Sequence, residues 1–111
     1  MFKRIRQLFR SDRPDFDHYT DAVERVKQLK REKRHDEAEK LLLWCIEQAE
    51  KETEYETLPP WYYKHLGIVY RKEERYDDEV KILQRYINRT ANPKKELRER
   101  LQRAQELANS S

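Results

Sequence analysis

The stretch Tyr63-Lys64-His65-Leu66-Gly67-Ile68-Val69-Tyr70 decides the fold, and it contains the single glycine of the chain. Tyr63, Leu66 and Tyr70 recur at steps of three and four residues, which is the spacing of one face of an α-helix. A glycine inside a helix costs about 1 kcal/mol relative to alanine. Because an exposed site would gain nothing from that cost, we expect Gly67 to lie where a facing helix approaches closely.

The same helical spacing continues outward from this stretch over most of the chain. Helices are predicted over residues 15–32, 36–54, 60–72 and 76–89, and a fifth helix begins near Asn92-Pro93. Asp36, Asp77 and Asn92 are the candidate N-caps. We therefore predict an all-α fold of two antiparallel helical hairpins, a C-terminal capping helix and a short amphipathic N-terminal segment.

Each predicted helix carries one apolar stripe that should face the core. The expected core positions are Phe16, Tyr19, Ala22, Val23, Val26, Leu29, Ala38, Leu41, Leu42, Cys45, Ile46, Ala49, Tyr63, Leu66, Gly67, Tyr70, Tyr76, Val80, Leu83, Tyr86, Ile87, Leu97, Leu101, Ala104 and Leu107. Trp44 and Leu43 are expected at the edges of the second stripe.

Composition limits the alternatives. Charged residues make up 42% of the 111 residues and hydrophobic residues 36%, so the helical spacing, and not the apolar content, is what argues against disorder. The absence of Asn-Gly and Asp-Gly pairs disfavours a sheet. A single cysteine rules out an internal disulfide, and no apolar run approaches the roughly 18 residues of a membrane span. We expect a cytoplasmic protein with no transmembrane segment and no secretory signal.

The chain divides into a basic amphipathic segment (1–14), a helical domain (15–108) and a frayed tail (109–111). Four apolar residues of the first segment recur at helical spacing and are its candidate docking residues: Phe2, Ile5, Leu8 and Phe9. The segment has three interpretations. In the first, these apolar residues dock on this domain or on a partner. In the others, residues 1–10 lie on an anionic membrane surface, or form a basic arm on nucleic acid.

The pattern Tyr63-x-x-Leu66-Gly67-x-x-Tyr70 resembles the first helix of a tetratricopeptide repeat. Tyr76, Leu83 and Pro93 continue the resemblance, but Glu79 stands where the family has a small alanine. An earlier, weaker repeat shows its small residue at Ala38, followed by Leu42 and Cys45, and has Ala22, Val26 and Leu29 in its first helix. The resemblance covers about residues 19–93, and it implies that a final helix with a polar outer side covers the end of the stack.

In the resembled family, the first helix of each hairpin lines a peptide-binding groove. Carried over, the groove positions are Thr20, Val23, Glu24, Lys27, Lys30, Arg31, Trp61, Lys64, His65, Ile68, Arg71 and Lys72, of which all but the first three are the predicted binding residues. Six of these positions are lysine or arginine and one is acidic, so the expected ligand is an acidic partner segment, a C-terminal carboxylate or a phosphate. His65 and Ile68 replace the asparagines of the family's carboxylate clamp, which disfavours chaperone C-termini.

These residues predict a non-catalytic adaptor that binds another protein. The alternatives are a nucleic-acid-associated protein that uses the same basic side, a membrane tether through residues 1–10, and a merely solvated charged face. His18, His35 and His65 are far apart in sequence and Cys45 lies on a core stripe, so we predict no catalytic residue, no metal and no cofactor. Since two repeats bury little continuous core, a homo-oligomer or a constitutive partner is also predicted, with Phe2, Phe9, Trp44 and Trp61 as contact candidates.

Overall fold

The computed structural model describes residues 16–52 and 57–110, and every regular element in these ranges is helical. A 3-10 turn η1 (Tyr19–Ala22) precedes α2 (Val23–Arg31), α3 (His35–Glu52), α4 (Pro60–Lys72), α5 (Tyr76–Arg89) and α6 (Lys95–Ser110). The predicted all-α class is confirmed for this part of the chain. The assignment of the helices to tetratricopeptide hairpins stays a prediction.

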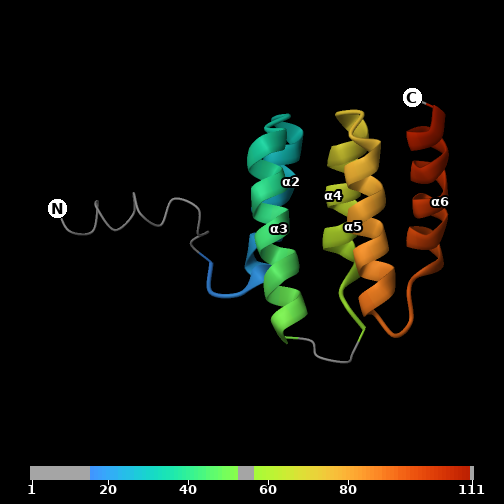
Figure 1. Cartoon of the computed structure of the whole chain (residues 1–111). Coiled ribbons are helices and arrows are strands. Elements are labelled where there is room, and N and C mark those ends of the chain that lie inside the picture. The colour runs from blue at the N-terminus through green and yellow to red at the C-terminus, as the bar shows by residue number, and fades with distance from the viewer. Residues whose placement is uncertain (1–15, 53–56, 111) are drawn as a thin grey trace.

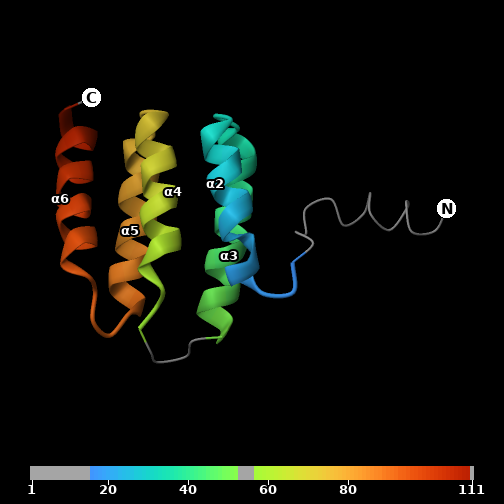
Figure 2. The ribbon, with the colours of Figure 1, turned by 180° about the vertical axis from the view of Figure 1, so that it is seen from behind.

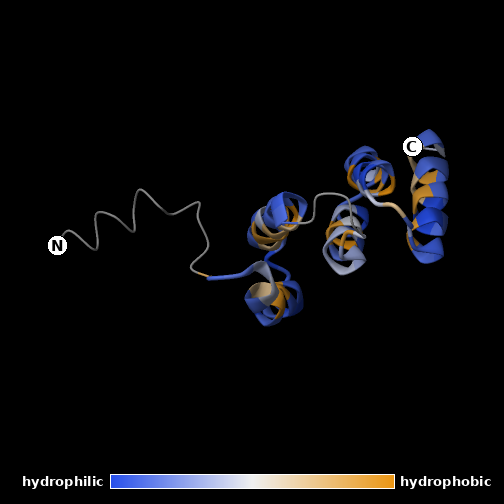
Figure 3. Ribbon diagram, turned by 90° about the horizontal axis from the view of Figure 1, so that it is seen from below, coloured by the Kyte–Doolittle hydropathy of each residue, from blue (hydrophilic) through white to orange (hydrophobic). Residues whose placement is uncertain are grey.

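Each helix runs opposite to the one before it (Figure 1). The contacts between helices follow the chain order, since α2 packs on α3, α3 on α4, α4 on α5, and α5 on α6. Seen from behind, α2 and α4 lie in front of α3 and α5 (Figure 2). In the view from below, apolar segments face neighbouring helices and polar segments face outward (Figure 3).

The predicted core positions on α3 are all buried, and most of those on the other helices are too. Phe16, Val23, Val80 and Ile87 are half-buried and pack on the edge of the core. The core also contains residues that the stripes did not include: Leu58, Tyr62, Val69 and Ile82. α4 buries more than one stripe because it packs against both α3 and α5 and also touches α6.

Several predicted helix ends were wrong. The first helix begins with η1, where the His18 ring nitrogen accepts a hydrogen bond from the Thr20 amide. α3 begins at His35 and α5 at Tyr76, so Asp36 and Asp77 lie inside the first turns and are not the caps. α6 begins at Lys95 and continues to Ser110, although residues 109–111 were predicted as a tail.

The turns after α2 and after α4 have the same backbone. Lys33 and Glu74 both adopt a left-handed φ of 59°. The next amides close matching bonds, from Arg34 N to Leu29 O (2.9 Å) and from Arg75 N to Tyr70 O (2.8 Å). These turns lie about 41 positions apart, whereas a tetratricopeptide repeat has a period of about 34 residues.

Two carboxylates of α3 join it to both following helices. Glu39 accepts hydrogen bonds from the Tyr70 hydroxyl (3.0 Å) and from Arg75 (2.8 Å). Glu50 accepts from the Tyr63 hydroxyl (2.8 Å) and from Arg85 (2.8 Å). The two tyrosines of the deciding stretch therefore hold α4 against α3 through their hydroxyl groups as well as their rings.

Candidate functional site: a basic face on α2 and α4

Lys30 and His65 meet between α2 and α4. The Lys30 ammonium donates to Nδ1 of His65 at 2.5 Å, and the Trp61 ring lies against the histidine ring, with ring centroids 4.3 Å apart. Burial, followed by the charge of Lys30, lowers the pKa of His65 to about 4. Burial and the nearby Lys72, Arg100 and Lys64 lower the pKa of Lys30 to about 8. At neutral pH the pair is a charged lysine on a neutral imidazole.

Three further lysines lie near this pair, and together with Lys30 they form what we call the basic face: Lys27, Lys30, Lys64 and Lys72. Their mutual effect is visible in the pKa of Lys30, which Lys72 and Lys64 both lower. Burial is the first cause of this lowered pKa, and the positive charges of Lys72, Arg100 and Lys64 lower it further. The face therefore has the electrostatic character that attracts an anion.

Two of the four lysines have a carboxylate partner. Lys64 pairs with Glu96 of α6 at 2.5 Å, and Lys27 pairs with Glu24 at 3.3 Å, both at largely exposed positions. Within the described ranges, no carboxylate lies within ion-pair distance of Lys30 or Lys72. Among the described residues, no carboxylate therefore neutralises these two charges.

Three predicted binding residues lie elsewhere or contribute differently. Arg71 turns away from a ligand, because its guanidinium pairs with the carboxylate of Glu79 (2.9 Å) and donates to the Arg100 carbonyl (3.2 Å). These contacts give Arg71 a structural role, and its place among the binding residues stays a prediction. Arg31 is exposed on α2, and Ile68 is half-buried on α4.

Sequence reasoning missed the contribution of α6. Arg100 approaches from α6 and lowers the pKa of both Lys30 and His65. Glu96, one turn earlier, provides the acid that pairs with Lys64. The i, i+4 spacing of Glu96 and Arg100 beside the stripe of Leu97 and Leu101 was the available signal, because it places both charges on one side of the helix.

The space beside Gly67 is filled by the side chains of Glu79 and Arg100. The carboxylate of Glu79 is fully buried and lies between Arg71 and Arg100, whose Nε is 2.9 Å from Glu79 Oε2 in an ion pair without hydrogen-bond alignment. A Cβ added at Gly67 would stand 3.4 Å from both Arg100 Nε and Glu79 Oε2. Gly67 is buried as expected, but the expected close approach of a facing helix is not found, because its neighbours are side-chain atoms of Glu79 and Arg100 at van der Waals distance.

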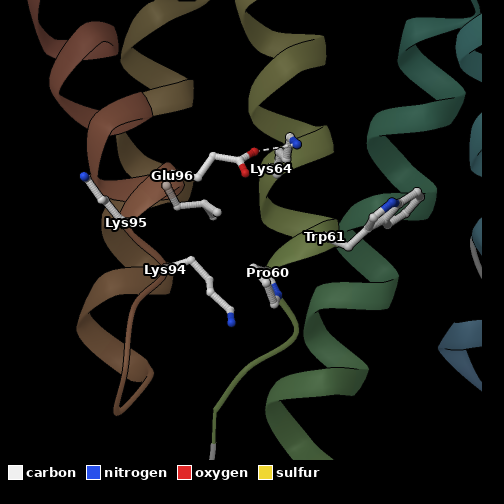
Figure 4. Close-up of a pocket in the computed structure, with 7 residues that line it drawn as sticks. Pro60, Trp61, Lys64, Lys94, Lys95 and Glu96 are labelled. Atoms are coloured by element: carbon white, nitrogen blue, oxygen red, sulfur yellow. Dashed lines mark ion pairs between the residues drawn. The ribbon is translucent and has the colours of Figure 1, made fainter.

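A pocket of about 340 Å³ adjoins the basic face where the start of α4 meets the start of α6 (Figure 4). Pro60, Lys64 and Leu97 line it together with Lys94 and Glu96. The ion pair between Lys64 and Glu96 spans its upper side, whereas the Trp61 ring extends from α4 on the side away from Lys95 (Figure 4).

The other reactive groups are in structural settings. Cys45 is fully buried, and burial raises the pKa of its thiol to about 12, so it is protonated at neutral pH. His18 pairs with Glu52 at 2.7 Å, and His35 lies 3.5 Å from Glu73. No group of three potential metal ligands is found in the described part of the chain. The proposed docking residues Phe2, Ile5, Leu8 and Phe9 lie outside it.

Comparison of the chain with protein-family models, with curated proteins and with solved structures finds no match. Among the helices of the described residues, none combines the length and the apolar character needed to cross a membrane.

Proposed function

We propose that this chain is a non-catalytic binding module whose basic face holds an acidic segment of a partner protein. The single observation that carries the proposal is the gathering of Lys27, Lys30 and Lys64 around His65, with Lys30 bonded to the ring and Lys72 near Lys30. A carboxylate-rich segment would offset the mutual repulsion of these lysines. Complementary charge of this kind sets the rate and the selectivity of association.

Two features indicate that the ligand of the basic face is a protein segment and not a smooth charged surface. The Trp61 and His65 rings are in contact beside the lysines, tilted by 35°, and they give an aromatic surface for an extended backbone or an apolar side chain. Lys30 is held in place by His65, so part of the face is ordered before a ligand arrives. Ordering beforehand reduces the entropy lost on binding.

The test compares two double variants with the same change of charge. Lys27→Glu with Lys72→Glu reverses two exposed lysines of the basic face, and Lys40→Glu with Lys81→Glu reverses two exposed lysines on α3 and α5. We expect the affinity for fluorescent glutamate-rich peptides, measured by anisotropy at fixed salt, to fall about tenfold or more in the first variant. The second variant should stay within about threefold of the wild type.

A third variant should act in the opposite direction. Glu96→Gln removes the carboxylate that forms an ion pair with Lys64. Lys64 can then pair with the peptide, so the affinity for the same peptides should rise. Equal losses in both double variants would contradict the proposal, because binding would then follow net charge alone. Tighter binding of single- or double-stranded oligonucleotides, with a steep loss of affinity in salt, would replace it with the nucleic-acid reading.

A further inference from the structure

The pocket between the first turns of α4 and α6 is formed by fixed parts of the chain. The Lys94 amide donates to the hydroxyl of the buried Tyr86 at 3.0 Å, which anchors the approach to α6. The Leu58 amide donates to Thr90 Oγ1, also at 3.0 Å, which ties the segment before α4 to the segment after α5. Because both borders are bonded to buried groups, the pocket is present before any ligand binds.

The inside and the rim of the pocket differ in character. Leu97, only 2% exposed, lies at the floor of the pocket, and the more accessible Pro60, which stands at the first position of α4, forms its apolar wall. Lys64 and Lys94 stand at the rim, with Glu96 as the acidic neighbour. The volume of about 340 Å³ is close to the lower end of ligand pockets, about 300–1,000 Å³. Its size and lining fit one large apolar side chain.

We propose that this pocket binds a large apolar side chain that the acidic partner segment carries beside its carboxylates. The inference rests on the proposed function, since it names a feature of the same ligand. Lys64 belongs both to the basic face and to the pocket rim, so one continuous segment reaches both. Its carboxylates pair with the lysines, and its apolar residue enters the pocket and displaces water from Pro60.

This division assigns separate roles to the two parts of the surface. The lysines attract acidic segments in general, because charge attraction does not depend on the order of residues. The pocket distinguishes among them, because burial of a leucine-sized side chain in an apolar site adds affinity that an alanine cannot supply. A segment with an aromatic or aliphatic residue at the right distance from its carboxylates is therefore preferred.

The test uses glutamate-rich peptides of about eight residues in which a single leucine occupies each position in turn, with an all-alanine counterpart. We expect the best leucine peptide to bind the full chain about tenfold more tightly than its alanine counterpart. Lys27→Glu with Lys72→Glu should weaken both peptides and leave their ratio unchanged, because neither lysine lines the pocket.

A photo-reactive leucine in the best peptide locates the contact independently of affinity. Its cross-links are expected within residues 60–64 and 94–97. Equal affinity for leucine and alanine peptides, or cross-links elsewhere, would overturn the pocket assignment and leave the acidic-segment proposal standing. If no acidic peptide binds the wild type, both proposals fail together.

Discussion

Gly67 leaves room for a buried ionic cluster. A methyl group at this position would meet Glu79 Oε2 and Arg100 Nε at 3.4 Å, which is the tight limit of van der Waals contact. The position thus accepts one carbon atom but not a branched side chain. Glu79 in turn depends on this space, because its carboxylate is fully buried and has Arg71 and Arg100 as its ion-pair partners.

Replacing the glycine tests this account in two steps. Gly67→Ala should leave the free energy of unfolding within about 1 kcal/mol of the wild type, because better helix propensity offsets a small shift of the ion pairs. Gly67→Val should destabilise the protein by about 1–3 kcal/mol through overpacking. Urea unfolding followed by circular dichroism measures both, and a strongly destabilised alanine variant would show that the close approach is tighter than this geometry.

His65 gives the basic face a measurable proton equilibrium. Its folded pKa of about 4 lies below the unfolded value of about 6.5, so only the unfolded state takes up the proton between these values. Stability should therefore fall as the pH falls from about 6.5 to about 4 and level off below. For Lys30, the lowered pKa of about 8 predicts that stability rises as the pH is raised from about 8 toward 10.5.

A titration of the His65 ring by NMR separates the two causes. We expect a midpoint near 4 in the wild type and a higher midpoint in Lys30→Met, where burial remains but the neighbouring charge is gone. A bound acidic peptide should raise the midpoint for the same electrostatic reason. An unchanged midpoint in Lys30→Met would contradict the contact between these two side chains.

At the scale of the helices, α3 is fixed to its successors by repeated polar contacts. Glu39 and Glu50 each accept one hydrogen bond from a tyrosine hydroxyl of α4. Each also accepts hydrogen bonds from an arginine, which lies in α5 for Glu50 and in the turn before α5 for Glu39. Burial alone would raise the pKa of Glu50, but the hydrogen bonds from Arg85 and Tyr63 outweigh it and hold that pKa below its usual range. Such contacts fix how one helical pair rests on the next.

Removing one of these carboxylates should be costly. Glu50→Ala leaves the fully buried Tyr63 hydroxyl without its acceptor, and we expect a loss of about 2–3 kcal/mol in the free energy of unfolding. Tyr63→Phe with Glu50→Ala removes both partners, so it should cost less than the sum of the two single variants. Additive losses in denaturant unfolding would show that the hydrogen bond contributes nothing to stability.

Helix positions were predictable to differing degrees. The bounds of α4 and α5 follow from the proline at the start of α4 and from the short polar turn after Lys72. Caps were less predictable, because Asp36 and Asp77 are good capping residues that the turns place one position inside their helices. The left-handed positions in these turns are occupied by Lys33 and Glu74 and not by glycine, so the sequence does not mark the turns.

The candidate site was predicted by carrying over groove positions from the resembled family. Lys30, Lys64 and His65 were named in this way, and the structure brings these three residues together. Arg71 shares the face by its position, yet the buried Glu79 draws its side chain inward. Arg100 was missed because its place near Lys30 depends on how α6 packs against α4, which no local pattern encodes.

In the molecule as a whole, helices alternate between two sides, with α2 and α4 in front of α3 and α5 when seen from behind (Figure 2). The basic face lies on α2 and α4, next to α6. Self-association and a constitutive partner stay predictions, and among the predicted contact residues Trp44 and Trp61 are half-buried, with Trp44 against Phe16 and Trp61 against His65.

The most direct test of the central claim is a map of amide chemical-shift changes as a glutamate-rich peptide is added to the full chain. The account predicts saturable changes on α2, on α4 and at the start of α6, centred on Lys30, His65 and Lys72, with α3 and the outer side of α5 unaffected. Changes confined to α3 and α5, or no saturable change at any residue of the basic face, would contradict it.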